Sequence, residues 1–448
     1  MSLRLDRRRF LSSCLMGASL LLAGTRTGQP AAPVEEVVGA TGVRAWLLRE
    51  PSIPFVSVAF RFEGGGAHDP EGLDGLTYLA SGLLDEGAGP YDSKAFRSAL
   101  EDNAIRLSFD ADRDALTGGL KTLNDTRELA FELLRLALTE PRFDEEPVER
   151  IRQQVMAELR RRETDPDYRS GRAWFARAFA GHPYARPTRG TPDTIARIGI
   201  PHLRQFAATR LSRDNLVIGV AGDITPRELA PLLDRTFGAL PPAAQLPMVP
   251  PARPATGGVV VERMAIPQSV VTFGHAGIDR HDPDYYAAYV ANYILGGGGF
   301  SSRLTNEIRE KRGLAYSVYS YLYDSRYAPL WLGGVATRND QVATSIELVE
   351  REAARMAAGE LAEQELVDAK TYLTGSFPLR LTSNDRIAEM LVAMQAQELG
   401  IDYLDKRNGY IEAVTLADTR RAAARLFAGP ILFSVVGDPV GLEDRLTP

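Results

Sequence analysis

The chain has 448 residues and a single cysteine, Cys14, which lies in an apolar stretch near the N-terminus. If processing removes that stretch, no cysteine remains. Disulfide scaffolds, thiolate zinc sites, iron–sulfur clusters and cysteine nucleophiles all depend on cysteine side chains. These four classes are therefore excluded for a processed chain.

Histidine is almost as scarce. The five histidines are His68, His182, His202, His275 and His281, and no two of them are three or four residues apart. A helix therefore cannot present two of them to one metal ion, and we interpret His275 and His281 as surface or loop residues. The sequence also has no Gly-x-Ser-x-Gly elbow, no Walker loop and no dinucleotide-binding fingerprint.

Basic residues are not in excess. The chain carries 52 Lys and Arg against 58 Asp and Glu, a net charge of −6. Five Arg and one Asp fall in residues 1–32, so residues 33–448 carry 47 basic and 57 acidic side chains, a net −10. No basic run follows residue 32, which argues against binding to a nucleic-acid backbone. No later segment is apolar for long enough to predict a membrane helix.

Residues 1–32 have the pattern of an export signal. Arg7–Leu11 (RRRFL) precede an apolar run over residues 14–24, and small residues follow up to Ala31 and Ala32. The paired arginines before Phe-Leu resemble the twin-arginine signal of bacteria. We expect residues 1–32 to be a signal peptide and the protein to be periplasmic. The alternative is an uncleaved N-terminal anchor.

A proline-rich segment divides the rest of the chain. Six prolines fall between Pro241 and Pro254, and such a segment favours an extended conformation that could span roughly 40 Å. We expect a linker at residues 241–257 between an N-terminal domain, residues 33–240, and a C-terminal domain, residues 258–448.

The two halves have similar patterns. Residues 215–223 and 430–438 are apolar strand-like runs that both end in Gly-Asp, and residues 131–159 and 346–373 both read as helix, loop and helix. A repeated block of strands and helices predicts the α+β class. We expect two related modules, each with a largely antiparallel sheet and helices on one face.

The most specific segment is Asp282–Tyr323, DPDYYAAYVANYILGGGGFSSRLTNEIREKRGLAYSVYSYLY. It predicts a helix, a glycine loop at Gly296–Gly299, a helix from about Ser302 to Lys311, and a strand. It resembles the C-terminal half of peptidase family M16, the pitrilysin and insulinase family, in its short bacterial form, and the resemblance covers nearly all of residues 35–440. It implies two homologous pitrilysin-like (LuxS/metallopeptidase-like) αβ modules in a clam-shell arrangement around a peptide. The role of the glycine loop stays open.

The family's zinc signature is degenerate in this chain. The resemblance implies His-x-x-Glu-His on the first helix of the N-terminal half, with a further Glu as the last ligand. Tyr78, Ser81 and Gly82 stand at the three signature positions, and Glu158 alone matches its ligand. We expect no metal in this chain and no catalytic residue that acts alone. Tyr78 and Ser81 could form a new acid–base pair, but core packing is the favoured interpretation because no histidine is near to activate them.

The family's second signature is retained. Members that act on peptides carry an Arg and, seven residues later, a Tyr that bind the substrate backbone. Arg309 and Tyr316 have this spacing. A guanidinium can grip carbonyl or carboxylate oxygens, and a phenol can donate to a developing oxyanion. The alternative is that Arg309 makes a surface ion pair and Tyr316 packs in the sheet.

These features predict a non-catalytic, substrate-binding subunit of an exported M16-type zinc peptidase. A partner subunit would hold the zinc, and the heterodimer, not this chain alone, would have metalloendopeptidase activity. The alternative is a catalytically dead peptide-binding or scaffold protein of the same fold, for example a homodimer. An autonomous zinc peptidase would need ligands that the sequence lacks.

Overall fold

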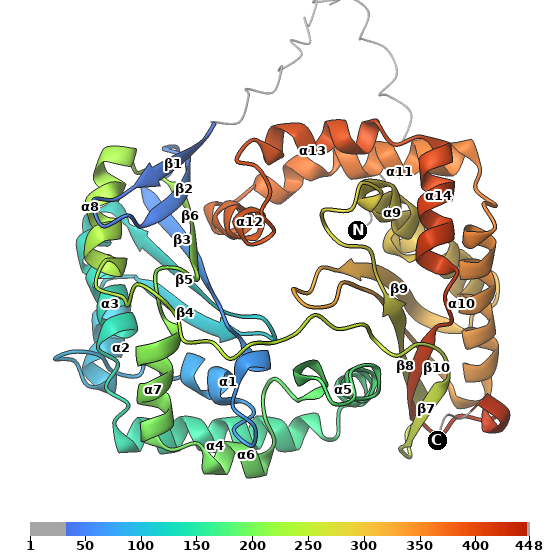
Figure 1. Ribbon diagram of the computed structural model, residues 1–448, viewed down its shortest axis with the longest axis horizontal. Helices are drawn as coiled ribbons and strands as arrows, with labels where there is room; N and C mark the ends of the chain where they lie inside the picture. The colour runs from blue at the N-terminus through green and yellow to red at the C-terminus, as the bar shows by residue number, and fades with distance from the viewer. Residues whose placement is uncertain (1–32, 446–448) are drawn as a thin grey trace, which may run out of the picture. The chain divides into compact units, whose positions relative to one another are not determined.

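The computed structural model describes residues 33–445. The signal peptide expected at residues 1–32 lies outside the described residues and stays a prediction. The described residues form two β-sheets, one from each half of the chain (Figure 1).

The N-terminal sheet has six strands in the order β1-β2-β6-β3-β5-β4. Its β2 and β6 strands are parallel, and the other neighbouring strands of this sheet are antiparallel. The last strand of the module therefore lies in the middle of the sheet. The strands are β1 (Val34–Val38), β2 (Arg44–Arg49), β3 (Phe55–Glu63), β4 (Arg106–Ala111), β5 (Ala115–Leu123) and β6 (Leu216–Gly222).

The C-terminal sheet has five strands in the order β7-β11-β8-β10-β9. Here β7 and β11 are parallel, and the remaining neighbours in this sheet are antiparallel. Its last strand is again internal, as in the first sheet. The strands are β7 (Val259–Arg263), β8 (Gln268–Ala276), β9 (Ala315–Tyr323), β10 (Leu330–Arg338) and β11 (Leu432–Gly437).

The repeated Gly-Asp endings occupy equivalent places in the two sheets. Gly222 ends β6 with φ 139° and Gly437 ends β11 with φ 155°. A Cβ at Gly222 would lie 2.3 Å from the carbonyl oxygen of Phe55, and one at Gly437 would lie 2.7 Å from Cα of Ser269. Both positions therefore require glycine. The prediction of two related α+β modules with largely antiparallel sheets is confirmed.

Helices of the same module cover one face of each sheet. Alternate residues of β3, such as Val58, Phe60 and Phe62, enter a core shared with the N-terminal helices, and Phe433 and Val435 of β11 do the same in the C-terminal module. The N-terminal helices are α1 (Leu76–Ser81), α2 (Ser93–Asp102), α3 (Arg127–Thr139), α4 (Glu145–Arg162), α5 (Pro166–Ala178), α6 (Pro192–Arg197), α7 (Ile200–Arg210) and α8 (Pro226–Phe237). The C-terminal helices are α9 (Tyr285–Asn292), α10 (Val342–Ala357), α11 (Glu363–Gly375), α12 (Asn384–Ala396), α13 (Tyr403–Glu412) and α14 (Leu416–Phe427).

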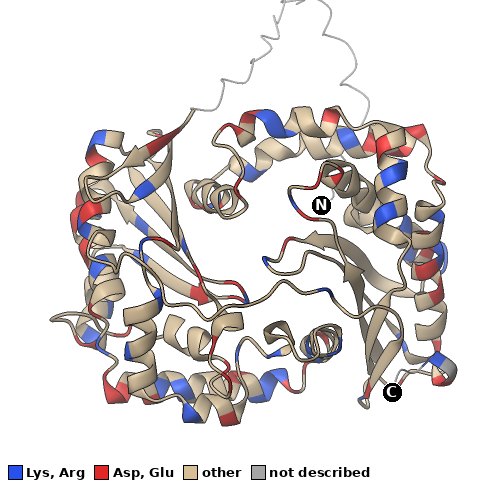
Figure 2. Cartoon of the chain, viewed as in Figure 1, with Lys and Arg blue, Asp and Glu red and all other residues tan. Residues whose placement is uncertain are grey.

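The helix–loop–helix repeat is confirmed as α3–α4 and α10–α11. On the outer helices α4 and α10, acidic and basic side chains are mixed along the helix (Figure 2). Over residues 33–445, no helix combines the length and the apolar character that crossing a membrane requires.

Each module also contributes one helix to the other module's sheet. The C-terminal helix α12 lies on β6 and β3, where its Ile387 and Leu391 pack against Ala59 and Ala221. Gly219 allows α12 to pack this closely on β6, because a Cβ there would lie 2.3 Å from the carbonyl oxygen of Ala388. The expectation that helices cover a single face is therefore wrong for the central strands.

The N-terminal helix α5 has the matching place on β8 and β11. Trp174 is fully buried and its Nε1 donates to the carbonyl oxygen of Leu432 at 3.1 Å. Ser170 donates to the carbonyl oxygen of Ser434 at 3.0 Å. The helices cover the central strands on this face because those strands present small apolar or polar side chains that a helix can approach closely.

Residues 241–257 have no helix or strand but are well anchored. Val249 is buried, and the backbone N–H groups of Gln245, Ala252 and Ala255 donate to carbonyl oxygens outside the segment. The proline-rich segment thus packs along the protein rather than forming a free tether.

His275 corrects one interpretation of the sequence. It is buried in β8, its ring centroid lies 4.8 Å from that of Trp331, and its Nδ1 is 2.8 Å from the carbonyl oxygen of Ala276. It is a core residue and not a surface or loop residue.

Candidate functional site

The degenerate zinc signature lies on α1 and at its C-terminal end. The helix begins after Gly75, whose φ of 91° favours glycine, and Gly82 is the C-cap. Ser81 is buried and its hydroxyl donates to the carbonyl oxygen of Tyr78 at 2.8 Å. Core packing is thus the correct interpretation for Ser81, which has no free hydroxyl to offer a substrate.

Tyr78 has a different role. Its hydroxyl donates to Oε2 of Glu158 on α4 at 2.8 Å, so the structure brings these two predicted positions together. The guanidinium of Arg189 donates to Oε1 of Glu158 at 2.8 Å and to the Tyr78 hydroxyl at 2.5 Å. Arg162, one turn after Glu158, donates to the same Oε1 at 2.8 Å. Tyr78 therefore belongs to a polar cluster and is not simply a packing residue.

The electrostatics of this cluster favour a charged Glu158 and a neutral Tyr78. Burial opposes ionisation of Glu158, but hydrogen bonds from Arg162 and Tyr78 and the charge of Arg189 outweigh it and lower the pKa of the carboxyl group. Burial and the hydrogen bond to Glu158 raise the pKa of Tyr78 to about 12. The Arg189 guanidinium also lies over the Tyr78 ring, 4.4 Å from its centroid.

The donor set at this position does not fit a zinc ion. Zinc sites in proteins are built from thiolate, imidazole and carboxylate ligands. Here Ser81 is engaged with the backbone, Gly82 has no side chain, and two guanidinium groups occupy the Glu158 carboxylate. Residues 33–445 contain no group of three or more His, Cys, Asp or Glu side chains that could hold a metal ion.

Arg309 and Tyr316 are brought together on the C-terminal module. Arg309 lies on the π-helical segment η6 (Thr305–Glu310), within the helix expected there, and Tyr316 is on strand β9. The Arg309 guanidinium carbon lies 5.0 Å from the centroid of the Tyr316 ring and 4.6 Å from that of Phe300. Two aromatic rings therefore hold the guanidinium.

The polar atoms of this pair are available. Tyr316 is 83% exposed. The ionic contact of Arg309 is with its chain neighbour Glu310, at 3.4 Å from Nε, and that carboxylate is half exposed. Among residues 33–445, no hydrogen bond engages the Tyr316 hydroxyl or the Arg309 side chain. The pair can therefore donate to a ligand without first giving up strong contacts in the protein.

The glycine run supports this arrangement. Gly296 and Gly297 lie in the π-helical segment η4 (Tyr293–Gly297), which packs against the edge strand β9. A Cβ at Gly296 would lie 2.7 Å from the backbone nitrogen of Ser320. The Asn292 side chain adds a hydrogen bond to β9, since its Nδ2 donates to the carbonyl oxygen of Ser320 at 3.2 Å. The run thus permits a close approach to β9 and leads directly to Phe300.

Three residues of these two clusters were not identified from the sequence. Arg162 is four residues after Glu158 on one helix, a spacing typical of an ion pair, so a signal was present. Arg189 lies in a loop 31 residues after Glu158, and Phe300 follows the glycine run; neither position has a sequence signal. Within the described residues, no hydrogen bond, ion pair or ring contact joins the Tyr78–Glu158 cluster to the Arg309–Tyr316 pair.

Comparison with known proteins identifies the family of the chain. A family model described as Insulinase (Peptidase family M16) matches residues 44–192, and one described as Peptidase M16 inactive domain matches residues 197–373. A protein of Helicobacter pylori named as a non-peptidase homolog, YmxG, is 28% identical over 387 residues, which cover 86% of this chain and 87% of that protein. An uncharacterized zinc protease of Streptomyces coelicolor is 27% identical over 408 residues, 88% of each chain.

Solved structures share the fold. A peptidase M16 inactive domain from Pseudomonas fluorescens has a TM-score of 0.85 and 27% identity, and the match covers 93% of this chain and 99% of the other. A protease from Helicobacter pylori has a TM-score of 0.82 at 18% identity, covering 91% of this chain and all of the other. The chain therefore belongs to peptidase family M16.

Proposed function

We propose that this chain is the substrate-binding subunit of an exported M16-type zinc peptidase heterodimer. A partner subunit holds the zinc, and this chain presents Arg309 and Tyr316 to the peptide at that centre. The observation that carries the proposal is that the Arg309 guanidinium lies against the rings of Phe300 and Tyr316, and that Tyr316 is 83% exposed.

The chemistry of the pair suits a peptide backbone. A guanidinium is planar, so rings on its faces leave the N–H groups at its edge directed outwards. Those donors match the carbonyl or carboxylate oxygens of a peptide. The Tyr316 hydroxyl adds one neutral donor for an oxygen that gains charge during hydrolysis. Stacking on Phe300 fixes the guanidinium before the peptide arrives, which lowers the entropic cost of binding.

The Glu158 cluster supports the proposal that the partner subunit holds the zinc and that this chain binds the peptide. Its carboxylate is already neutralised by Arg162 and Arg189, and Tyr78 is held neutral by its raised pKa of about 12. No group in this cluster is free to activate water. The side chains of the Tyr78–Glu158 cluster are all engaged with one another, whereas Arg309 and Tyr316 are available to a ligand. A chain of this kind therefore needs a second chain for catalysis.

Reconstitution tests this proposal. The processed chain is purified alone and together with a family M16 protein that carries His-x-x-Glu-His, for which a protein encoded next to it is the first choice. We expect a stable complex in size-exclusion chromatography, and cleavage of an unstructured reporter peptide by the mixture but by neither subunit alone. A complex without cleavage would favour the scaffold function, and no complex would overturn the heterodimer.

Export is a separate part of the proposal. It rests on the pattern of residues 1–32. Expression of the full chain with its natural N-terminus, followed by N-terminal sequencing of the periplasmic fraction, should find a mature protein that begins close to Pro33. A full-length chain retained in the cytoplasm would contradict it.

A further inference from the structure

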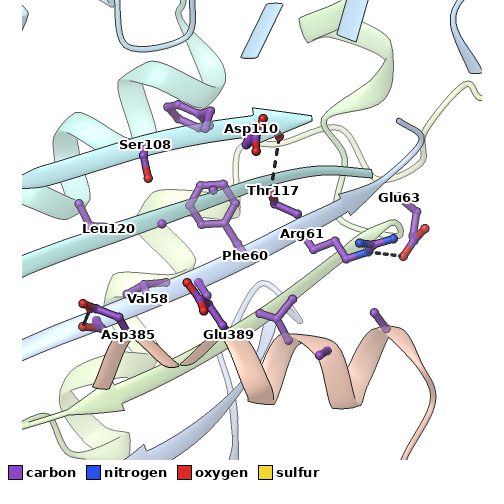
Figure 3. A pocket seen from close by; sticks show the side chains of 18 of the residues that line it. Val58, Phe60, Arg61, Glu63, Ser108, Asp110, Thr117, Leu120, Asp385 and Glu389 are labelled. Carbon is purple, nitrogen blue, oxygen red and sulfur yellow. Dashed lines mark hydrogen bonds and ion pairs between the residues drawn. The ribbon is translucent and has the colours of Figure 1, made fainter. Parts of the chain in front are cut away.

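A cavity of about 720 Å³ lies between the N-terminal sheet and α12. We call this cavity the trough. Its floor is the part of the sheet beside α12, where Gly119 and Ser108 lie side by side on β5 and β4, next to Ala59 under the edge of the helix. Its wall is the flank of α12, with Val392 and Ala396. Figure 3 shows the strands above this helix with the trough between them.

The floor is flat because its side chains are small. A Cβ added at Gly119 would meet its nearest atoms at 3.6 Å (Ser108 Oγ) and 3.8 Å (the Val58 carbonyl oxygen), so the space above this glycine is open. The neighbouring Gly118 faces the other way, since a Cβ there would lie 2.2 Å from Phe60. Small side chains over a sheet allow the backbone of an extended ligand to lie close to the floor.

The two ends of the trough are polar and lie about four peptide residues apart. At one end Lys121 of β5 pairs with Asp385 of α12 at 2.9 Å, and at the other end Arg61 pairs with Glu63 at 2.8 Å. Arg61 is opposite Thr117 in the β3–β5 ladder, four residues before Lys121, a span of about 13 Å. Polar ends and small side chains between them suit a peptide better than a purely apolar ligand.

The far end offers an additional acceptor. Asp324 lines the trough there, and its Oδ2 accepts a hydrogen bond from Tyr285 at 2.8 Å. Its Oδ1 is buried and has no hydrogen-bond partner among residues 33–445. Buried polar atoms are normally satisfied, so an N–H group of a bound peptide is a suitable partner.

Glu389 gives the trough a charge preference. Figure 3 places it on α12 between the Asp385 end and the Arg61–Glu63 end. Among the described residues, no ion pair or hydrogen bond engages its carboxylate. The trough is lined by six carboxylates and four basic groups, so its formal charge is negative. An exposed, unpaired carboxylate in a negative cavity selects a cation.

We propose that the trough binds about four residues of an extended peptide, with one lysine or arginine side chain directed at Glu389. This inference rests on the proposed function for the presence of a peptide and deepens it, because it names a second subsite and a basic residue in the substrate. The small floor residues contact the peptide backbone, and the wall of α12 contacts its apolar side chains.

Peptide binding to the isolated full chain tests this inference. The probes are two fluorescein-labelled heptapeptides, capped at both ends and built from alanine and serine, with lysine or its uncharged isostere norleucine at the centre. Fluorescence anisotropy gives both dissociation constants. We expect the lysine probe to bind about fivefold more tightly, as for an ion pair at a partly exposed site.

Two variants and two matched controls assign the binding to the trough. Glu389→Gln should make the dissociation constants of the two probes equal. Gly119→Leu should fill the trough and weaken the binding of both probes by about tenfold or more. The controls are Glu347→Gln on α10, which removes an exposed carboxylate elsewhere, and Gly409→Leu on α13, where an added Cβ meets nothing within 4 Å. Both controls should bind as the unmodified chain does.

The outcomes separate this inference from the proposed function. If neither probe binds, or if Glu389→Gln and Gly119→Leu bind as the unmodified chain does, the trough is not the site and the inference is wrong. If Arg309→Ala abolishes binding while Gly119→Leu does not, the Arg309–Tyr316 pair is the whole site. If Glu389→Gln and Gly119→Leu behave as expected but reconstitution yields no complex and no cleavage, the trough binds peptide and the heterodimer proposal fails.

Discussion

The guanidinium of Arg189 donates to the carboxylate of Glu158 at 2.8 Å. The resemblance to family M16 matches that carboxylate to the last zinc ligand, and in this chain two arginines donate to it. Tyr78, Glu158, Arg162 and Arg189 therefore form a cluster in which each polar group has a partner among the other side chains.

A first prediction concerns zinc. The isolated chain should contain no stoichiometric zinc after dialysis, measured by plasma mass spectrometry. Restoring the ligands with Tyr78→His, Ser81→Glu and Gly82→His should bind zinc weakly, because the Arg189 guanidinium still competes for Glu158. Adding Arg189→Ala should strengthen that binding. One zinc per unmodified chain that is lost on Glu158→Ala would contradict this account.

A second prediction concerns stability. Arg189→Ala removes charge-assisted hydrogen bonds to Glu158 and Tyr78 and should lower the free energy of unfolding by about 1–3 kcal/mol. Arg189→Lys should recover only part of this loss, since an ammonium cannot reproduce the fork or the stacking on the Tyr78 ring. Urea denaturation measures both, and Arg227→Ala at an exposed position is the control. A change below about 0.5 kcal/mol in Arg189→Ala would show that the cluster is not structural.

A third prediction concerns alkaline pH. The pKa of Tyr78 is raised from its ordinary value of about 10 to about 12 in the folded protein. The folded state therefore holds this proton more tightly, and the associated stability is present below pH 10 and is lost as the pH rises towards 12. Tyr78→Phe should lose stability less steeply in that window than the unmodified protein. If the free energy of unfolding falls with pH equally steeply in the two proteins, the raised pKa does not belong to Tyr78. Tyr410→Phe on α13 is the control.

A fourth prediction concerns the packing of α12 on β6. Gly219 and Gly119 lie on either side of Ala59 in the sheet, but only Gly219 is beneath the helix. Gly219→Ala should cost about 1–3 kcal/mol and increase hydrogen exchange in residues 384–396, because its Cβ would meet the Ala388 carbonyl oxygen. Gly119→Ala should be neutral or slightly stabilising. Equal effects of the two substitutions would mean that α12 does not lie on β6 as described.

Particular residues show how far the sequence could predict this structure. The Gly-Asp endings at Gly222 and Gly437 and the two helix pairs revealed the repeat, because local patterns repeat wherever the same backbone is built twice. The exchange of α5 and α12 between the modules left no local signal, since a helix pattern identifies an apolar face but not the sheet that it covers. The polar cluster around Tyr78 was missed for the same reason: Arg189 reaches Glu158 only through the fold.

The activity of the reconstituted pair with Tyr316→Phe tests the central claim most directly. Tyr319→Phe is the matched control, since it removes a hydroxyl from another exposed tyrosine of the same strand. The account predicts that Tyr316→Phe leaves the complex intact and lowers the turnover of a reporter peptide by about 10²–10³, the cost of one lost oxyanion donor. The pair that carries Tyr319→Phe should cleave the reporter peptide at the same rate as the unmodified pair. Full turnover by the Tyr316→Phe pair would contradict the account, because the retained tyrosine would then have no part in the reaction.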